Sequence, residues 1–325
     1  MKKSLWMLGL AVAAMTSCTN EEVMEVAQNR AIGFNAFVNN NTRVITEVEN
    51  LIGFYVFGEF GDVDGTYGTQ VFNNESDKVV HYWQASKYYS FGAYADGDDT
   101  KIDNAIFNAA SGTLTFPQYT PNDANDLVAA VTKLQSNTDV TANSPVSLTF
   151  GHMLSQVKFT FKTTDADAYT LKITELKIEG AASQATGVYN GTATWNTVQK
   201  NEGYAYAEIP DVAMAENDYT ASVVRLVIPQ ASTNNLKVTF KATVSGSGMA
   251  EKSNTFEAYL DYAAGEVAGT TDNTWTPGYC YNYIATINAD QIAPELENQK
   301  IEFTPTVTGW ENAADTDKGE LKGAN

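Results

Sequence analysis

Short runs of alternating apolar and polar residues recur along the chain, whereas long helical patterns are absent. In the first run, within residues 31–38, every second residue is apolar, as in a strand with one buried face. The inward residues of this run are Ile32, Phe34, Ala36 and Val38. Further runs rich in Val, Ile, Thr, Tyr and Phe alternate with turns of Gly, Asn, Asp and Pro. The pattern predicts strands at 51–57, 78–83, 87–95, 112–117, 145–150, 154–162, 169–180, 204–209, 222–229, 235–244, 254–260, 279–287 and 301–307.

Only "NDANDLVAAVTKL" (122–134) resembles a short helix. The predicted fold class is therefore all-β, with two antiparallel β-sandwich domains in tandem. The stretch around Gly151 repeats the outline of the opening, an alternating strand, a polar turn and a second alternating strand. This repetition predicts an N-terminal domain at 44–150 and a C-terminal domain at 151–325.

The first 18 residues read as an export signal. A basic start with Lys2 and Lys3 precedes an apolar run that is too short for a permanent membrane span. Small residues then lead to Cys18, as in a bacterial lipobox, although Met15 stands where leucine is usual. We expect 1–18 to be a lipoprotein signal peptide that ends at the lipidated Cys18, with ordinary secretion as the alternative.

Charge and cysteine content narrow the class of protein further. Without the signal peptide the chain has 18 basic and 39 acidic residues, a net charge of −21. Such a charge argues against binding to nucleic acid or to anionic lipid surfaces. Once Cys18 is acylated, Cys280 has no partner, so stability has to come from burial of a core rather than from disulfides.

Candidate catalytic and metal-binding residues are few. The two histidines, His81 and His152, lie in strand-like surroundings that favour structural hydrogen bonds over catalysis. Two acidic loops, "GDVDG" (61–65) and "ADGDD" (95–99), lack the distal glutamate of a calcium-binding loop. We therefore predict no catalytic residues, no metal site, no cofactor and no enzymatic activity.

Several motifs together resemble a known family. They are "SCTNEE" at the lipobox, "TRV" after the first strand, "LTFGHMLSQVKFTF", "WTPGYCYNYIATI" and the C-terminal "IEFTPTVTGW". In this order and spacing, over nearly the whole chain, they resemble the fimbrillin family, the subunits of type V pili. The resemblance implies a transthyretin-like two-domain β-sandwich that is exported as a lipoprotein to the outer membrane and assembled into a cell-surface pilus that supports adhesion.

The resemblance also implies a set of functional residues. A trypsin-like, Arg/Lys-specific protease would cut between Arg43 and Val44, or alternatively after Arg30, which would leave the first strand in place. Residues 19–43 would then be a tether and removable strand, and a strand from another pilin subunit, of the same or a related type, would replace 31–38. The expected donor strand is 301–307, with Ile301, Phe303, Pro305 and Val307 on one face.

One departure from the family pattern and two alternative roles for the chain stay open. Pro305 has no amide hydrogen, so the donor strand could pair fully on only one side at that point. The family also contains uncut anchor subunits and tip adhesins, which the sequence separates poorly from stalk subunits. A surface-anchored glycan-binding lipoprotein is the other reading, with tyrosines and the tryptophans Trp83 and Trp275 as the sugar platform.

Overall fold

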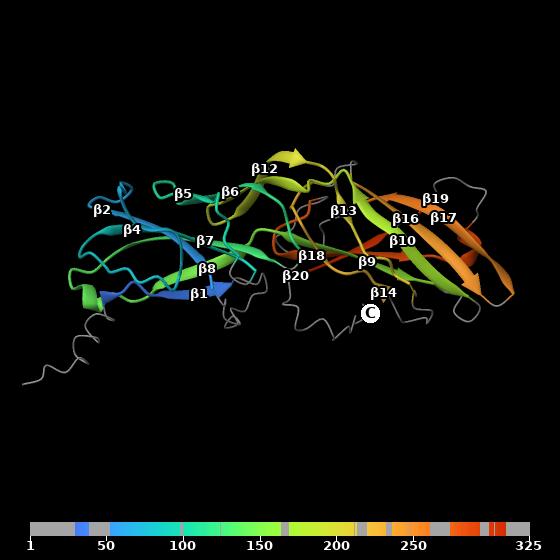
Figure 1. Ribbon diagram of the computed structural model, residues 1–325, viewed down its shortest axis with the longest axis horizontal. Coiled ribbons are helices and arrows are strands. Elements are labelled where there is room, and N and C mark those ends of the chain that lie inside the picture. Colours follow the sequence, from blue (N-terminus) through green and yellow to red (C-terminus); the bar gives the residue numbers. More distant parts are fainter. Residues whose placement is uncertain are drawn as a thin grey trace, which may run out of the picture.

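The computed structural model is an elongated all-β molecule, so the predicted fold class is confirmed (Figure 1). Two short 3₁₀ helices, η1 (Val140–Ala142) and η2 (Ala289–Gln291), accompany the strands. None of the helices within the described residues is long and apolar enough to cross a membrane. The structure describes residues 30–38, 53–97, 100–123, 125–163, 169–210, 212, 220–231, 236–246, 248–260, 274–292, 299–301 and 303–309.

A six-stranded and a four-stranded sheet form what we call the N-terminal unit. In spatial order the larger sheet consists of β1 (Phe34–Val38), β8 (Val146–His152), β7 (Leu127–Gln135), β4 (Tyr88–Asp96), β2 (Tyr55–Gly61) and β3 (Thr69–Ser76). The smaller sheet consists of β12 (Ala193–Lys200), β11 (Gln184–Tyr189), β6 (Thr113–Tyr119) and β5 (Ile106–Asn108).

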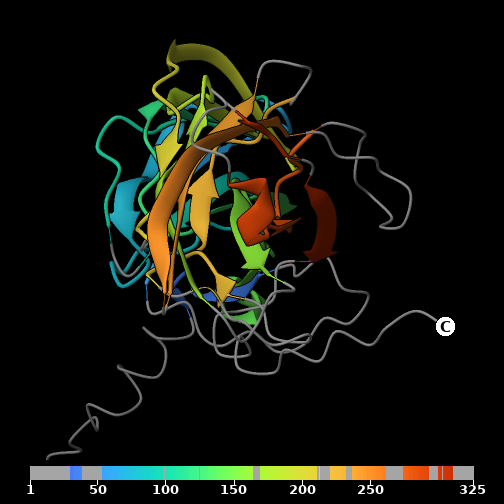
Figure 2. The ribbon, with the colours of Figure 1, turned by 90° about the vertical axis from the view of Figure 1, so that its right-hand side faces the viewer.

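Two further sheets form the C-terminal unit and enclose one core between them. Seen end-on in Figure 2, the orange strands of one sheet curve around the red segments near the end of the chain. One sheet has the order β13 (Tyr204–Ala205), β10 (Thr170–Glu179), β16 (Lys237–Gly246), β17 (Met249–Tyr259) and β19 (Gln299–Lys300). The other has the order β14 (Thr220–Ala221), β9 (Ser155–Lys162), β18 (Tyr279–Thr286) and β20 (Thr304–Gly309), with β15 (Arg225–Val227) also paired to β9.

The prediction of a short helix at 122–134 is wrong, because most of this stretch forms strand β7. Val128 and Ala130 face one core of the N-terminal unit, and Leu127 and Ala129 face the other. A strand that is buried on both faces has an unbroken apolar run instead of an alternation. Periodicity alone therefore could not separate this strand from a helix.

The chain does leave the first large sheet close to the expected boundary, since β8 ends at His152 and β9 begins at Ser155. However, the hairpin of β11 and β12 returns to the N-terminal unit and pairs there with β6. Domains at 44–150 and 151–325 therefore do not correspond to separate sheets. Inward-facing Tyr189 and the indole of Trp195, which donates to the carbonyl of Met153 (2.7 Å), hold the hairpin in place.

Strand direction is mostly antiparallel, as expected, but three pairs among the described strands are parallel. These pairs are β1 with β8, β9 with β18, and β17 with β19. The side-chain alternation of a half-buried strand is the same in either direction, so the sequence pattern carries no signal for it.

A buried carboxylate lies between the two sheets of the N-terminal unit. Asp96, at the end of β4, accepts a hydrogen bond from the hydroxyl of Tyr119 (2.9 Å). Burial, together with the smaller effect of the negative charge of Asp126, raises the pKa of Asp96 to about 6, although the Tyr119 hydrogen bond acts in the opposite direction. Because the folded pKa lies above the unfolded one, the fold loses stability as pH rises from about 4 through about 6.

The D96N variant should therefore unfold at a higher temperature than the parent at pH 7.5, and at nearly the same temperature at pH 4. The amide keeps an oxygen acceptor for Tyr119 and removes the buried charge. Each kcal/mol gained should raise Tm by about 2–4 °C. Thermal unfolding at both pH values checks this, with exposed D103N as the control. An equal shift at both pH values would contradict the role of the charge.

Candidate functional site

Strand β1 forms one edge of the six-stranded sheet, and its inward side chains cover the core beneath this sheet. It pairs in parallel with β8 over its whole length, from Phe34 opposite Val146 to Val38 opposite Phe150. On its other side, among the described residues, the hydrogen bonds come from the residues just before β1. The N–H of Ile32 donates to the carbonyl of His81 (2.8 Å), and the N–H of Trp83 donates to the carbonyl of Arg30 (3.0 Å). The segment 81–83 therefore pairs with the residues that lead into β1, on the side away from β8.

The inward face of this strand fills a core lined with aromatic rings. The ring of Phe34 meets those of Phe54, Phe72 and Phe91 edge to face, with centroids 5.8, 5.5 and 5.9 Å away. We call these three rings the Phe34 socket. Phe72 belongs to β3, at the opposite end of the sheet order, so the sheet curls until its two ends share one core.

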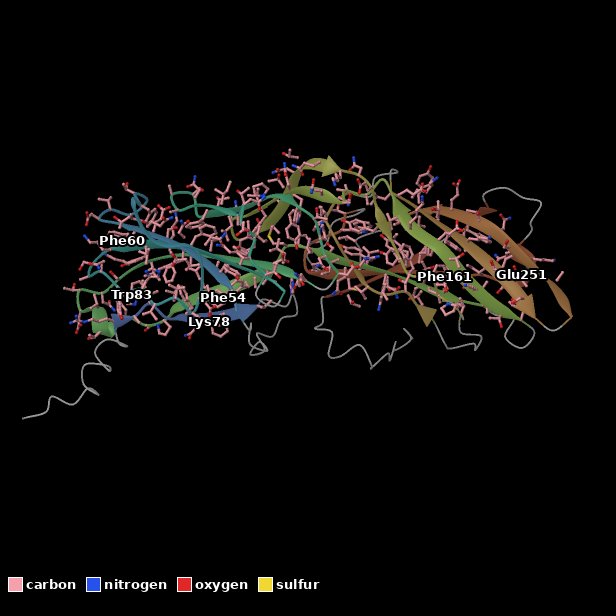
Figure 3. The ribbon with its side chains drawn as sticks, viewed as in Figure 1. Phe54, Phe60, Lys78, Trp83, Phe161 and Glu251 are labelled. Atoms are coloured by element: carbon pink, nitrogen blue, oxygen red, sulfur yellow. The ribbon has the colours of Figure 1, made fainter. Side chains whose placement is uncertain are left out.

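The other predicted inward residues lie in the same core. Ile32 is buried in this core, and the half-buried side chains of Ala36 and Val38 pack against the core. Asn35 and Phe37 face the opposite side, and Phe37 is 36% exposed. The structure thus places all four predicted residues on one face. Figure 3 shows Phe54 and Trp83, which belong to this core, close to β1, and Phe161 in the other half of the molecule.

Replacing Phe34 by alanine should destabilise the uncut chain by about 2–4 kcal/mol, since it removes a large side chain and leaves a gap among three rings. The matched variant F37A, on the same strand but facing outward, should cost no more than about 0.5 kcal/mol. Denaturant unfolding followed by tryptophan fluorescence measures both, because Trp83 lies in this core. Equal effects of the two variants would show that β1 does not close the core.

The C-terminal segment closes the other unit in a similar way. Its first residues form β19 beside β17, and the N–H of Ile301 donates to the carbonyl of Glu257 (3.3 Å). The chain then crosses to the other sheet, where β20 runs antiparallel to β18. Residues 299–309 therefore bridge the edges of both sheets of the C-terminal unit.

Phe303 is the central side chain of this crossing. Its ring lies near those of Phe159, Phe161, Phe240 and Tyr283, with centroids 5.5, 6.1, 6.2 and 6.4 Å away, all edge to face. Ile301 and Val307 are half-buried and pack against the same core. Three of the four predicted donor residues thus pack against one core, which in this structure belongs to their own chain.

Pro305 lies in β20 opposite Tyr283 of β18. Among the described strands, β18 is the only neighbour of β20, so Pro305 sits at a sheet edge. Edge strands are the positions where a missing amide hydrogen is tolerated. A β-sheet could not easily be extended beyond β20 for the same reason.

The processing and lipidation residues Cys18, Arg43 and Val44 lie outside the described residues. Arg30 is described and exposed, and it directly precedes Ala31, which bridges to Tyr82. The pairing of segment 81–83 with the residues before β1 was not predicted from the sequence. The apolar run at 78–83 pointed to a strand, but nothing in the run pointed to the first strand as its partner.

Each histidine lies within hydrogen-bonding distance of a carboxylate. His152 is buried, and its Nδ1 lies 2.7 Å from the carboxylate of Asp126. His81 Nε2 lies 2.7 Å from Glu75. Trp83 and Trp275 are 5% and 0% exposed, so neither offers a ring face on which a sugar could stack. Within the described residues, no three His, Cys, Asp or Glu side chains gather into a possible metal site.

Comparisons with known proteins agree with this architecture. A fimbrial protein from Bacteroides vulgatus ATCC 8482 has a TM-score of 0.55 at 18% identity, covering 87% of this chain and 100% of the other. A candidate cell adhesion protein from Bacteroides uniformis ATCC 8492 has a TM-score of 0.47 at 18% identity, with 86% and 98% covered. At 18% identity the first structure supports a similar fold and nothing more. The TM-score of the second structure is too low to support a conclusion.

No curated protein sequence matches the chain significantly. The sequence model of the fimbrillin-like family, in contrast, matches residues 18–310, which is most of the chain and includes both β1 and β20. The chain therefore belongs to the fimbrillin-like family.

Proposed function

We propose that this chain is a structural subunit of a cell-surface pilus and that it polymerises by donor-strand exchange. It is exported as a lipoprotein that is anchored in the outer membrane through Cys18, and an Arg/Lys-specific protease cuts it after Arg43. The first strand then leaves with the lipid, and a strand from another subunit takes its place. The resulting fibre supports cell adhesion.

The observation that carries this proposal is the position of β1. It is an edge strand that seals an aromatic core, and it lies close to the start of the chain. Its loss would uncover Phe54, Phe72 and Phe91 and leave β8 without a partner on that side. Each large apolar side chain is worth roughly 1.5–3 kcal/mol when fully buried, so the loss compares with the net stability of a domain. Such an open core strongly favours a replacement strand.

The position of Arg43 also supports the proposal. It is the only Lys or Arg between the end of β1 at Val38 and the start of β2 at Tyr55. A cut there separates the whole of β1 from the rest of the fold. A cut after Arg30 would leave β1 attached to β2 and the core closed.

Subunits in assembled fibres should therefore begin at Val44, which N-terminal sequencing of fibres sheared from cells would test. The R43Q variant should stay uncut and lipid-anchored, and it should form no fibres. The matched variant R30Q should be processed like the parent. Wild-type fibres whose subunits still contain residues 31–43 would refute the cleavage step.

The C-terminal segment should determine whether the cut protein polymerises. Wild-type fibres should give ladders of oligomers that resist mild heating in detergent. V307D should abolish the ladders, because it puts a charge on the inward face of the donor strand, whereas T308D, on the exposed face, should retain them. Folding of each uncut variant is checked by thermal unfolding, with the milder V307T as a further variant. Ladders formed normally by a folded V307D protein would contradict the proposal.

The other roles considered for this chain give different outcomes in the same experiments. An anchor subunit would keep its lipidated N-terminus in the fibre, so sequencing separates it from a stalk subunit. A glycan-binding lipoprotein would need exposed aromatic faces, and burial of Trp83 and Trp275 disfavours those two residues as its platform.

A further inference from the structure

The two closing segments have the same inward pattern. Residues 32–38 read Ile-x-Phe-x-Ala-x-Val, and residues 301–307 read Ile-x-Phe-x-Pro-x-Val. Three of the four inward residues are identical, and the third position is compact in both segments. Each segment also sets its phenylalanine among edge-to-face aromatic rings. This correspondence is a property of this chain and needs only a second copy of it.

We propose that residues 301–307 of a second copy of this chain replace residues 32–38 position for position, running parallel to β8, with Phe303 in the Phe34 socket. This inference rests on the proposed strand exchange and adds the partner, the direction and the register. It makes the chain complementary to itself, so that one kind of subunit suffices to extend a fibre.

The direction follows from where the large and compact residues stand. In the parallel direction Phe303 meets Phe54, Phe72 and Phe91, and Pro305 takes the place of the small Ala36. In the reverse direction Pro305 would enter the Phe34 socket and Phe303 would occupy the position of Ala36. The reverse arrangement would leave a gap in one place and overfill another, and both are costly in a packed core. A shift by two residues misplaces the phenylalanine in the same way.

The hydrogen bonds of β1 explain why proline is acceptable at position 305. Val146 N–H donates to the carbonyl of Gly33 (2.7 Å), so odd-numbered residues of this segment point their backbone groups at β8. Ile32 N–H donates to His81 on the opposite side, so even-numbered residues point away from β8. Pro305 would occupy the even position 36. Its missing N–H therefore removes no bond to β8, which resolves the departure noted in the sequence.

Phe303 would also exchange one environment for a similar one. In its own chain it meets four rings edge to face at 5.5–6.4 Å, and the Phe34 socket offers three rings at 5.5–5.9 Å from the present phenylalanine. Edge-to-face pairs add about 0.5–1.5 kcal/mol beyond burial. Much of the aromatic packing lost on leaving one core is therefore regained in the other.

Cysteine cross-linking between two full-length chains tests the register and direction. In the proposed register Thr306 takes the place of Phe37, which lies opposite Thr149 of β8. Cells that make the fibres would co-express T149C in one chain and T306C in another, both in a C280A background, and a short bifunctional thiol reagent would be applied to sheared fibres. We expect a covalent dimer in high yield. The matched pair of T149C with E302C should give a several-fold lower yield, because position 302 then lies four residues away, roughly 13 Å along the strand.

Each result has a distinct meaning. A high yield with T306C and a low yield with E302C supports the proposed register. Heat-resistant ladders with the opposite preference, or with neither cross-link, would overturn the register while strand exchange itself stands. Wild-type protein that forms no ladders would refute the proposed function, whatever the cross-links show. Fibres of the C280A chain alone provide the background yield.

Discussion

The rest of the structure depends on one contact, the closure of an aromatic core by an edge strand. Phe34 touches rings that precede or lie within three other strands, Phe54 before β2, Phe72 in β3 and Phe91 in β4. One side chain thus joins the two ends of a six-stranded sheet that would otherwise stay open along one side. The core requires a strand in this place, and the present strand is held there by pairing with β8 and by packing, with a single covalent link, through residues 39–54, to the strands that follow.

The sequence placed Ile32, Phe34, Ala36 and Val38 on one face, and Ile301, Phe303 and Val307 on another, and these residues do pack against a core. An edge strand that covers a core has one solvent-exposed and one buried face, so its residues alternate. The sequence pattern failed for β7, whose two buried faces remove the alternation. It could not show that β11 and β12 return to the N-terminal unit, since that pairing links residues more than 60 positions apart. Nor could it show that β1 runs parallel to β8 or that His81 and Trp83 flank the first strand.

In the uncut chain each of the two cores is covered by its own segment. Residues 31–38 close the N-terminal unit, and residues 299–309 close the C-terminal unit. If the first strand were removed as proposed, one segment would remain for two cores, and a neighbour's N-terminal unit and the segment's own C-terminal unit would compete for it. The similar surroundings of Phe34 and Phe303 mean that neither core excludes the other's phenylalanine by size or chemistry. Backbone pairing and contacts between whole subunits then decide the balance.

The separation of the two segments in the fold has a final consequence. The segment 299–309 belongs to one unit and the Phe34 socket to the other, and the molecule is elongated (Figure 1). A contact between them joins unlike surfaces of successive molecules, so it cannot be satisfied by a two-fold symmetric pair. Repeated between successive molecules as proposed, such a heterologous contact would give an open filament with polarity. One tip of this filament would display an unfilled socket and the other an unused strand, so the two tips would differ chemically and could be capped by different molecules.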